Sequence, residues 1–219
     1  IFALAFTEAI THSYQLLADL SRKKLLEIGG GSGEQAIYFA TKGAIVTVID
    51  VSPESLKATE QLAKGQGIIL SVHQMDVEEM NFKSEEFDLI YINSVLMHAH
   101  PQKVLPECSR VLKKEGKLVI IEPLQYAPFV QLYRLLGSYR KTKPRYATLK
   151  MFQQNKIYFS EYSHQEFYLF ASLLLPLFWV KSKITPKIYH LVAKGDKALL
   201  FFLPFLQKLC WVSVVEYRK

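Results

Sequence analysis

A glycine-rich turn is the first feature of the sequence with the chemistry to bind a ligand. It joins a short apolar segment to a segment of helical periodicity and reads Glu27-Ile28-Gly29-Gly30-Gly31-Ser32-Gly33. Glycines allow backbone conformations that other residues avoid, and they let a ligand approach the backbone closely. The first turn of the helix that follows presents unpaired NH groups to a negatively charged group. We therefore predict that Gly29, Gly31 and Gly33 contact a nucleotide-like ligand.

Three acidic residues stand at or near the ends of successive predicted strands. Glu27 directly precedes the glycines, where it suits a cationic amino group and would repel a pyrophosphate. Asp50, followed by Val51, ends a second apolar segment, where a carboxylate can accept hydrogen bonds from both ribose hydroxyls. Asp76 and Val77 follow a third segment, where the acid suits an adenine amino group and the valine suits the ring. Together they predict S-adenosylmethionine as cofactor, with S-adenosylhomocysteine as its product.

Two other functions remain open on these residues. Gly31-Ser32-Gly33-Glu34-Gln35-Ala36 also satisfies the GxGxxA fingerprint of NAD-binding proteins, so an NAD-dependent oxidoreductase is an alternative. Glu27 argues against it, as does the absence of a Tyr-x-x-x-Lys pair suitable for hydride chemistry. A noncatalytic nucleotide-binding module on the same fold is the other alternative, because no essential catalytic residue is identifiable.

A polar loop follows the fourth predicted strand, where the ligand crevice of an open α/β sheet lies. We expect Asn93 and Ser94 to contact the cofactor mainly through backbone atoms. His98 is the candidate general base, because an imidazole can take a proton from an attacking hydroxyl or amine near neutral pH. The alternative is that His98 packs against or caps the helix beginning at Pro101. Methyl transfer also needs little beyond alignment, so positioning alone is a sufficient mechanism.

The substrate is expected beyond the fifth strand. Candidate contacts there are Glu122, Tyr126, Arg140 and Arg145. An arginine fork would hold a carboxylate or phosphate. The alternatives are a structural role for Glu122 and a solvated basic face for the arginines. A helix over residues 2–20 is expected either to close over the cofactor or to pack in the core.

Short apolar segments alternate with helical patterns as far as Pro123, which is typical of βαβ units and a parallel sheet. We expect strands at residues 24–28, 45–50, 68–74, 87–92 and 117–121, with a turn at 113–116. Helices are expected at 34–42, from Pro53 and at 101–112. Further along, the patterns predict a helix at 149–158, a possible strand at 166–169 and a closing strand at 211–217.

Taken in order, these motifs resemble the class I S-adenosylmethionine-dependent methyltransferases. The likeness rests on the glycine turn, Asp50, Asp76-Val77, and the blocks FDLIYINSVLMH and ECSRVLKKEGKLVIIEP. It is closest to the small-molecule group that includes ubiquinone and menaquinone biosynthesis methyltransferases, and it covers about residues 20–124. The resemblance implies a Rossmann-like, doubly wound α/β fold whose seven-stranded sheet is mostly parallel with an antiparallel last strand. The function it implies is methyl transfer to an oxygen, nitrogen or carbon of a small apolar or lipid-like acceptor.

Charge and apolar residues are distributed unevenly along the 219 residues. Residues 1–124 hold 12 Lys/Arg against 16 Asp/Glu, and residues 125–219 hold 15 against 4. Two apolar runs, at 173–180 and 198–209, are flanked by Lys181, Lys183, Lys187, Lys194, Lys197 and Lys208. They predict either buried helices at the sheet edge or an interfacial helix on an anionic membrane surface. Both runs are shorter than the roughly 18–20 residues that span a bilayer.

We interpret the chain as one domain, with a cofactor-binding core at 1–124, a basic helical substrate cap and sheet edge at 125–209, and a closing strand at 210–219. Cys108 and Cys210 are expected to be free thiols, and no Cys/His cluster predicts a metal. No secretory leader is recognisable, so we expect a cytoplasmic protein, with a peripheral membrane location as the further hypothesis. A nucleic-acid partner is disfavoured because no Asn/Asp-Pro-Pro-Tyr motif follows the fourth strand. The sequence leaves the oligomeric state open.

Overall fold

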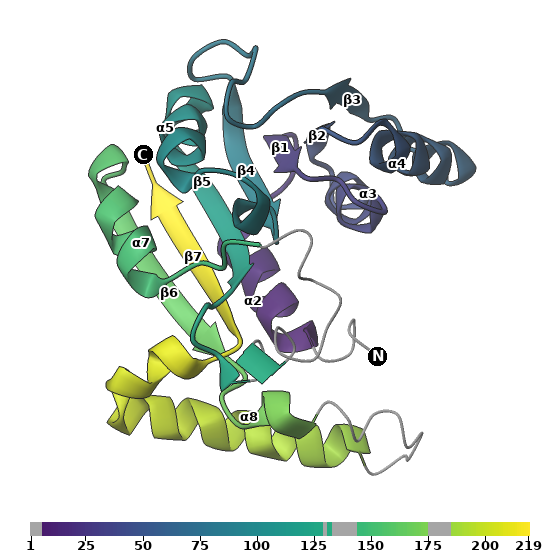
Figure 1. Ribbon diagram of the computed structural model, residues 1–219. Coiled ribbons are helices and arrows are strands. Elements are labelled where there is room, and N and C mark those ends of the chain that lie inside the picture. The colour runs from purple at the N-terminus through teal and green to yellow at the C-terminus, as the bar shows by residue number, and fades with distance from the viewer. Residues whose placement is uncertain (1–5, 129–130, 133–143, 175–184) are drawn as a thin grey trace.

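A computed structural model describes residues 6–128, 131–132, 144–174 and 185–219 (Figure 1). In this part of the chain seven strands form one sheet in the order β3-β2-β1-β4-β5-β7-β6. The strands are β1 (Lys24–Ile28), β2 (Ile45–Asp50), β3 (Ser71–Gln74), β4 (Phe87–Asn93), β5 (Leu112–Pro123), β6 (Glu161–Phe167) and β7 (Val212–Arg218). Strands β1 to β5 are parallel, and β7 is antiparallel to both β5 and β6. The predicted doubly wound sheet with an antiparallel last strand is confirmed.

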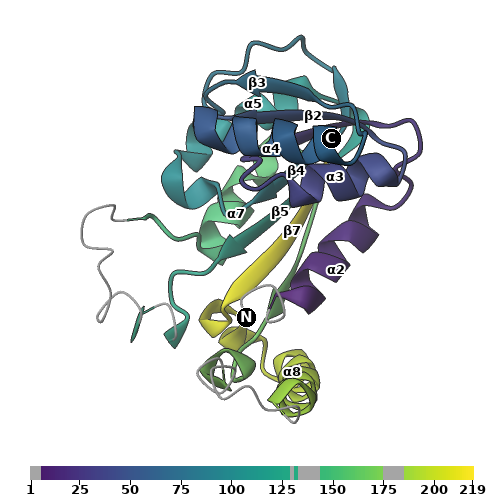
Figure 2. The same ribbon diagram turned by 90° about the vertical axis from the view of Figure 1, so that its right-hand side faces the viewer.

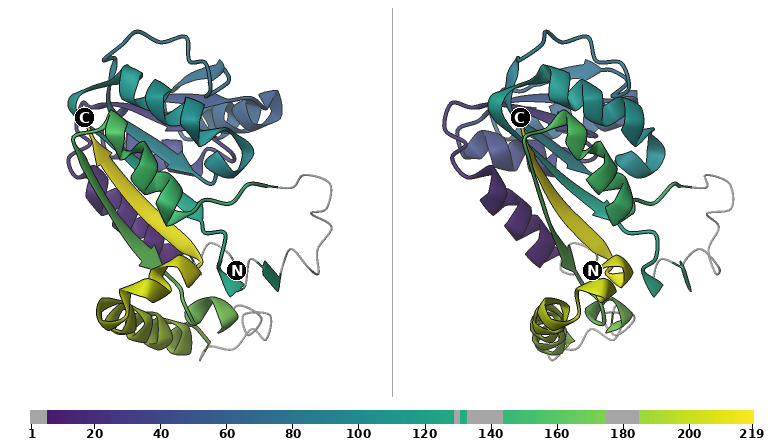
Figure 3. Two further views of the ribbon diagram at one scale, coloured as in Figure 1. Left: turned by 60° about the vertical axis from the view of Figure 1, so that its left-hand side comes forward. Right: turned by 90° about the vertical axis from the view of Figure 1, so that its left-hand side faces the viewer.

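Helices cover both faces of the sheet because its strands are apolar on both sides. One face carries α2 (Thr7–Leu17), α3 (Glu34–Thr41) and α4 (Pro53–Gly65), which lie in front of the sheet in Figure 2. The other face carries α5 (Pro101–Val111) and α7 (Leu149–Asn155), seen in front in Figure 3, right. Side chains alternate between the faces along each strand, so Leu25 joins the first core and Leu26 and Ile28 join the second.

The helix α8 (Thr185–Phe202) lies across the end of the molecule toward which β5 and β6 run (Figures 1 and 3). Asp196 attaches it to the sheet, because its carboxylate accepts hydrogen bonds from the backbone NH groups of Phe170 and Ala171, each at 3.1 Å. A 3-10 turn, η5 (Pro204–Leu209), continues from α8 toward β7. No helix in the described ranges has the length and apolar character needed to cross a membrane.

Three predicted boundaries are wrong. The third strand begins at Ser71, and Ile69 before it is 94% exposed, because β3 is an edge strand paired only with β2. The fifth strand begins at Leu112 and includes residues 113–116, which we expected to form a turn; a register shift opposite Phe87 and Leu89 accommodates them. The sixth strand is Glu161–Phe167 instead of 166–169, since an edge strand can carry polar side chains that hide its apolar pattern.

The two helices predicted at residues 2–20 and 149–158 are shorter in the structure. The first is α2, and its expected residues 2–5 lie outside the described residues. The second ends as α7 at Asn155 and continues as the 3-10 turn η3 (Lys156–Tyr158). Cys108 and Cys210 are both buried and free.

Candidate functional site

The turn between β1 and α3 depends on glycine at two positions. Gly29 and Gly33 have φ angles of +80° and +81°, in the left-handed region that side chains disfavour. A Cβ on Gly29 would lie 2.3 Å from the Val95 Cγ2 atom, and one on Gly33 would lie 2.8 Å from the Thr59 Cα atom. The turn is therefore fitted closely against α4 and the loop after β4.

A cavity of about 420 Å³ opens above this turn. Its lining comes from four elements: the turn itself, the first residues of α3, the middle of α2 and the end of β4. The lining residues are Ile10, Tyr14, Gly29, Gly30, Gly31, Ser32, Glu34, Gln35, Asn93 and Ser94. Ile10 and Tyr14 of α2 line the cavity, so this helix borders the candidate site as well as contributing Ala9 and Leu17 to the core.

Glu27 lies at the end of β1, directly before the turn, and its buried side chain is not among the residues that line the cavity. It pairs with Tyr91 of β4 across the sheet, and the Tyr91 hydroxyl accepts a hydrogen bond from Gln35 of the cavity wall at 3.0 Å. The Glu27 side chain is 1% exposed, and neither carboxylate oxygen has a hydrogen-bond partner among the described residues. Burial raises the pKa of Glu27 to about 8.

An unpaired buried carboxyl is costly to a protein, so such a group points to a ligand that satisfies it. Burial also raises the pKa of Tyr14 to about 12, and the negative charge of Glu27 adds to that shift. A buried carboxyl next to the glycine turn, together with the helix N-terminus that follows the turn, fits a ligand that carries an ammonium group beside a carboxylate.

Asp50 connects the end of β2 to the turn. Its Oδ1 atom accepts from the Ser52 NH at 2.9 Å, and its Oδ2 atom lies 3.5 Å from the Gly31 nitrogen. Val51 beside it is exposed. Asp50 and Gly33 do not belong to the lining of the 420 Å³ cavity, which takes in only the part of the predicted site nearest the turn.

Asp76 and Val77 lie further along the same edge of the sheet. Asp76 is exposed, and its carboxylate accepts from the Glu78 NH at 2.9 Å. Val77 is buried in the core cluster that includes Ile49 and Met80, so its side chain is not presented at the surface. Neither residue lines the cavity, and their predicted contact with an adenine ring stays a prediction.

Glu122 supports the loop after β4 from below. The side chain is fully buried, and its Oε1 atom accepts from the Leu96 NH at 2.6 Å. Burial raises its pKa to about 8, against the opposing effect of the backbone hydrogen bonds it accepts. Of the two roles considered for Glu122, this geometry favours the structural one. It fixes the 3-10 turn η1 (Leu96–His98), which ends in the candidate base.

His98 is exposed at the end of η1. Its imidazole makes no hydrogen bond or ion pair within the described residues, and it does not cap α5, whose N-cap residue is His100. His100 instead bonds Glu78, with 2.6 Å between the His100 Nδ1 atom and the Glu78 Oε1 atom. The backbone of Arg145 donates to the Met97 carbonyl at 2.9 Å, so the chain beyond β5 returns beside His98.

A second cavity of about 410 Å³ lies beside that returning segment. Its lining residues are Leu124, Tyr126, Ala147, Thr148, Leu149, Lys150, Pro204, Phe205 and Lys208. Tyr126 lines this cavity, and its predicted contact with a substrate stays a prediction. Arg145 is exposed and outside both cavity linings, and Arg140 lies outside the described residues.

Two residues of the site escaped sequence reasoning. Gln35 follows the glycine turn and lines the cavity, and its place in the first turn of the helix was the available signal. Tyr91 reaches the site only through its register with Glu27, which the sequence does not reveal. In the described ranges, no group of three or more His, Cys, Asp or Glu side chains is arranged to hold a metal ion.

Comparison with known proteins agrees with this geometry. Residues 26–120 match the family model described as a methyltransferase domain. An uncharacterized methyltransferase of Bacillus subtilis, YodH, is 33% identical over 119 residues, which cover 54% of this chain and 50% of YodH. A ubiquinone biosynthesis O-methyltransferase of Histophilus somni is 35% identical over 105 residues, covering 45% of this chain and 44% of that protein. The matches therefore span about half the length of these relatives.

The fold is shared more widely than the sequence. The phosphoethanolamine N-methyltransferase 2 of Haemonchus contortus, solved in complex with S-adenosyl-L-methionine, superposes with a TM-score of 0.68 at 17% identity. That superposition covers 95% of this chain and 51% of the other. At such low identity the likeness extends to the fold alone.

Proposed function

We propose that this chain, a class I S-adenosylmethionine-dependent methyltransferase over residues 26–120, transfers the cofactor's methyl group to a small apolar or lipid-like acceptor. The observation that carries the proposal is the buried Glu27 carboxyl, which has no partner among the described residues and lies under the glycine turn. The ionised form of this carboxyl would pair with an ammonium group and would repel a pyrophosphate, which disfavours NAD.

We assign a different part of the cofactor to each group of predicted site residues. Glu27 would bind the amino group, and the turn at Gly29, Gly31 and Gly33, with the start of α3, would hold the carboxylate. Asp50 accepts from the ribose hydroxyls beside Val51. The exposed Asp76 would accept from the adenine amino group, and Asn93 and Ser94 line the side toward the acceptor.

Bound there, the cofactor supplies a methyl group on a positively charged sulfur. The chain's own contribution is alignment and exclusion of water, for which α2 covers the cavity with Ile10 and Tyr14. Glu122 holds η1 in place through the Leu96 NH, and His98 on that turn accepts the proton of an attacking hydroxyl or amine. Where the acceptor is already a good nucleophile, alignment alone suffices.

The second cavity supports the proposal that the acceptor is apolar. Apolar residues dominate its lining, including Leu124, Leu149 and Phe205, with the Tyr126 ring at its edge. Such a lining suits a ring or a chain of hydrocarbon. The name of the Histophilus somni relative supports a small-molecule acceptor in the same sense.

Calorimetric titration with S-adenosylhomocysteine tests the cofactor site. We expect Asp50→Ala and Glu27→Gln each to weaken binding by roughly 10- to 100-fold, because each removes a charged hydrogen-bond partner. Glu60→Gln, an exposed acid on α4, is the matched control and should leave the affinity unchanged. Unaltered affinity in the Asp50 and Glu27 variants, or tighter binding of NAD by the wild type, would sink the assignment.

A further inference from the structure

The helix α8 has apolar residues on two opposite sides. Its inner side packs on the sheet end through Tyr189, Ala193 and Leu200, all buried. Its outer side carries residues 188, 191, 195, 198 and 202, a spacing of three and four that places them on one stripe of a helix. Leu191 and Phe202 on this stripe are 71% and 76% exposed. The apolar residues of the inner side pack in the core. Those of the outer side are exposed, and no described part of the chain covers them.

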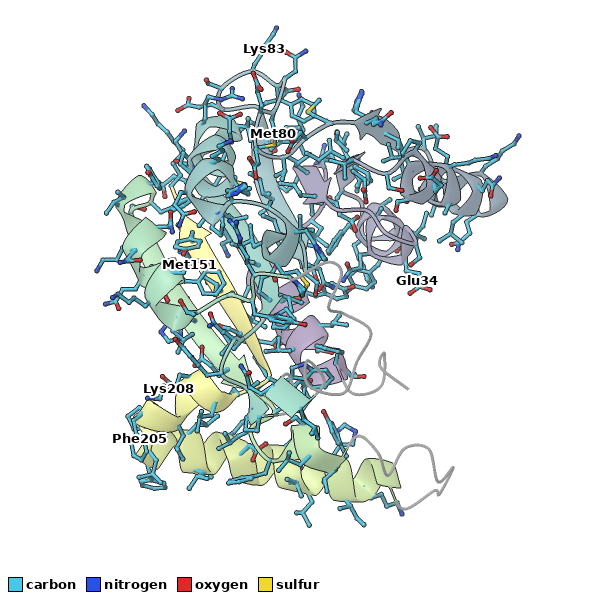
Figure 4. The ribbon with its side chains drawn as sticks, in the orientation of Figure 1. Glu34, Met80, Lys83, Met151, Phe205 and Lys208 are labelled. Atoms are coloured by element: carbon cyan, nitrogen blue, oxygen red, sulfur yellow. The ribbon has the colours of Figure 1, made fainter. Side chains whose placement is uncertain are left out.

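The exposed apolar surface widens at the carboxyl end of α8. Phe201 is 82% exposed, and Phe205 on η5 is 64% exposed. Figure 4 shows Phe205 and Lys208 near each other, at the end of α8 that leads into η5. Exposed side chains of this size gathered in one place mark an interaction surface, since single exposed apolar residues are ordinary but clusters are not. Of the two alternatives for residues 198–209, burial at the sheet edge is wrong for Phe201, Phe202 and Phe205, which are all exposed.

The charges around this surface have one sign. The charged side chains of α8 and η5 that the structure describes are Lys187, Lys194, Asp196, Lys197 and Lys208, and the single acid among them is buried. Lys197 pairs with Glu8 of α2 at 3.7 Å, whereas Lys187, Lys194 and Lys208 make no ion pair with a described residue. A second copy of the same helix would bring lysines against lysines. An anionic surface would be attracted instead.

We infer that this surface docks the protein on an anionic lipid membrane, with α8 lying in the plane of the interface. The docking face consists of the apolar side chains Leu191, Phe201, Phe202 and Phe205 together with Lys187, Lys194 and Lys208. Helices of this kind place phenylalanine and leucine about 5–10 Å deep in the headgroup region while lysines reach the lipid phosphates. The affinity arises from apolar burial and charge together, so neither alone is sufficient.

The docking face continues into the second cavity. Phe205 and Lys208 belong to both, and the cavity is also lined by Leu124 and Tyr126, which follow the carboxyl end of β5. An acceptor dissolved in the bilayer would reach this cavity without crossing water. This extension to the acceptor's source rests on the proposed function, whereas the docking itself does not.

Flotation with lipid vesicles tests the docking. Vesicles of phosphatidylcholine alone are compared with vesicles containing about 30% phosphatidylglycerol, at low and at high salt. We expect binding to the anionic vesicles only, with a strong decrease at high salt. The variant Phe201→Ser/Phe202→Ser/Phe205→Ser should lower partitioning by at least roughly tenfold. The variant Lys187→Gln/Lys194→Gln/Lys208→Gln should lower it by roughly 100-fold, because each lysine contributes about a fivefold gain.

Matched controls separate docking from general surface effects. Ile69→Ser/Ile157→Ser removes two exposed apolar side chains elsewhere, and Lys57→Gln/Lys64→Gln/Lys83→Gln removes three exposed lysines elsewhere. Both controls should float like the wild type. All variants are titrated with S-adenosylhomocysteine, and unchanged affinity shows that they are folded.

The outcomes separate the two proposals. No wild-type flotation, or equal flotation of the docking-face variants, overturns the docking. A concentration-dependent dimer in light scattering that the phenylalanine variant dissolves also overturns it, since the face would then be an interface between two copies. Flotation without any binding of S-adenosylhomocysteine would keep the docking and overturn the methyltransferase proposal.

Discussion

At the scale of one residue, Glu27 is a buried carboxyl whose burial is unfavourable without a ligand and is the basis of the proposed binding site. Its carboxyl lies buried beside Tyr91 without a hydrogen-bond partner in the described structure, and burial holds its pKa near 8. The unfolded chain would ionise this group near its ordinary pKa of about 4.5. The stability contributed by the protonated form is therefore fully present below about pH 4.5 and is lost as the pH rises through about 8. A cationic ligand reverses this balance because it stabilises the ionised form.

Proton release on ligand binding follows from that balance. At pH 7 a carboxyl with a pKa near 8 is about 90% protonated, so binding of an ammonium group should release close to one proton. Titrations with S-adenosylhomocysteine in two buffers of different ionisation enthalpy measure this number. Glu27→Gln should reduce it to about zero. Glu122→Gln is the control, because Glu122 has the same raised pKa but caps η1, and this variant should still release the proton. An unchanged release in Glu27→Gln would exclude Glu27 as the ammonium partner.

At the scale of elements, the β1–α3 turn sets how closely two helices approach the sheet. Gly33 begins α3 in a left-handed conformation and stands against the backbone of Thr59 in α4. Gly29 stands against Val95 in the loop after β4 in the same manner. The lack of side chains in the turn lets these neighbouring elements approach closely, and the proposed cofactor site depends on the same feature.

Alanine substitution distinguishes these glycines from an ordinary one. Gly33→Ala should destabilise the protein by at least about 2 kcal/mol, because it combines a positive φ with a Cβ placed 2.8 Å from a backbone atom. Gly65→Ala, at the end of α4 with no heavy atom within 4 Å of its Cβ position, should stabilise by about 0.5–1 kcal/mol. Chemical denaturation measures both. Equal effects at the two positions would contradict the close approach of α3 and α4.

At the scale of the whole molecule, the cofactor site gathers segments that lie far apart in the chain. Ile10 of α2, Gln35 of α3 and Asn93 of β4 meet at one cavity, and Glu122 of β5 supports the adjoining loop. A ligand there binds the folded chain and not the unfolded one, so its binding energy adds to the stability of the molecule.

Thermal unfolding with two ligands tests this coupling. S-adenosylhomocysteine at a hundred times its dissociation constant should add about 2.7 kcal/mol and raise the melting temperature by roughly 5–10 °C. NAD at the same concentration should leave the melting temperature unchanged. A larger shift with NAD would favour the dinucleotide alternative over the methyl donor.

The sequence alone determined the first five strands, the glycine turn and the acids beside it, because these features follow from local periodicity and the conformational freedom of glycine. It missed the start of β5 and most of β6, whose boundaries depend on partner strands and on an edge position. Tertiary structure alone decided that Glu27 stands opposite Tyr91, that Glu122 turns inward to Leu96, and that α8 leaves its phenylalanines outward. Each of these depends on contacts between residues distant in sequence, and such contacts leave no local pattern.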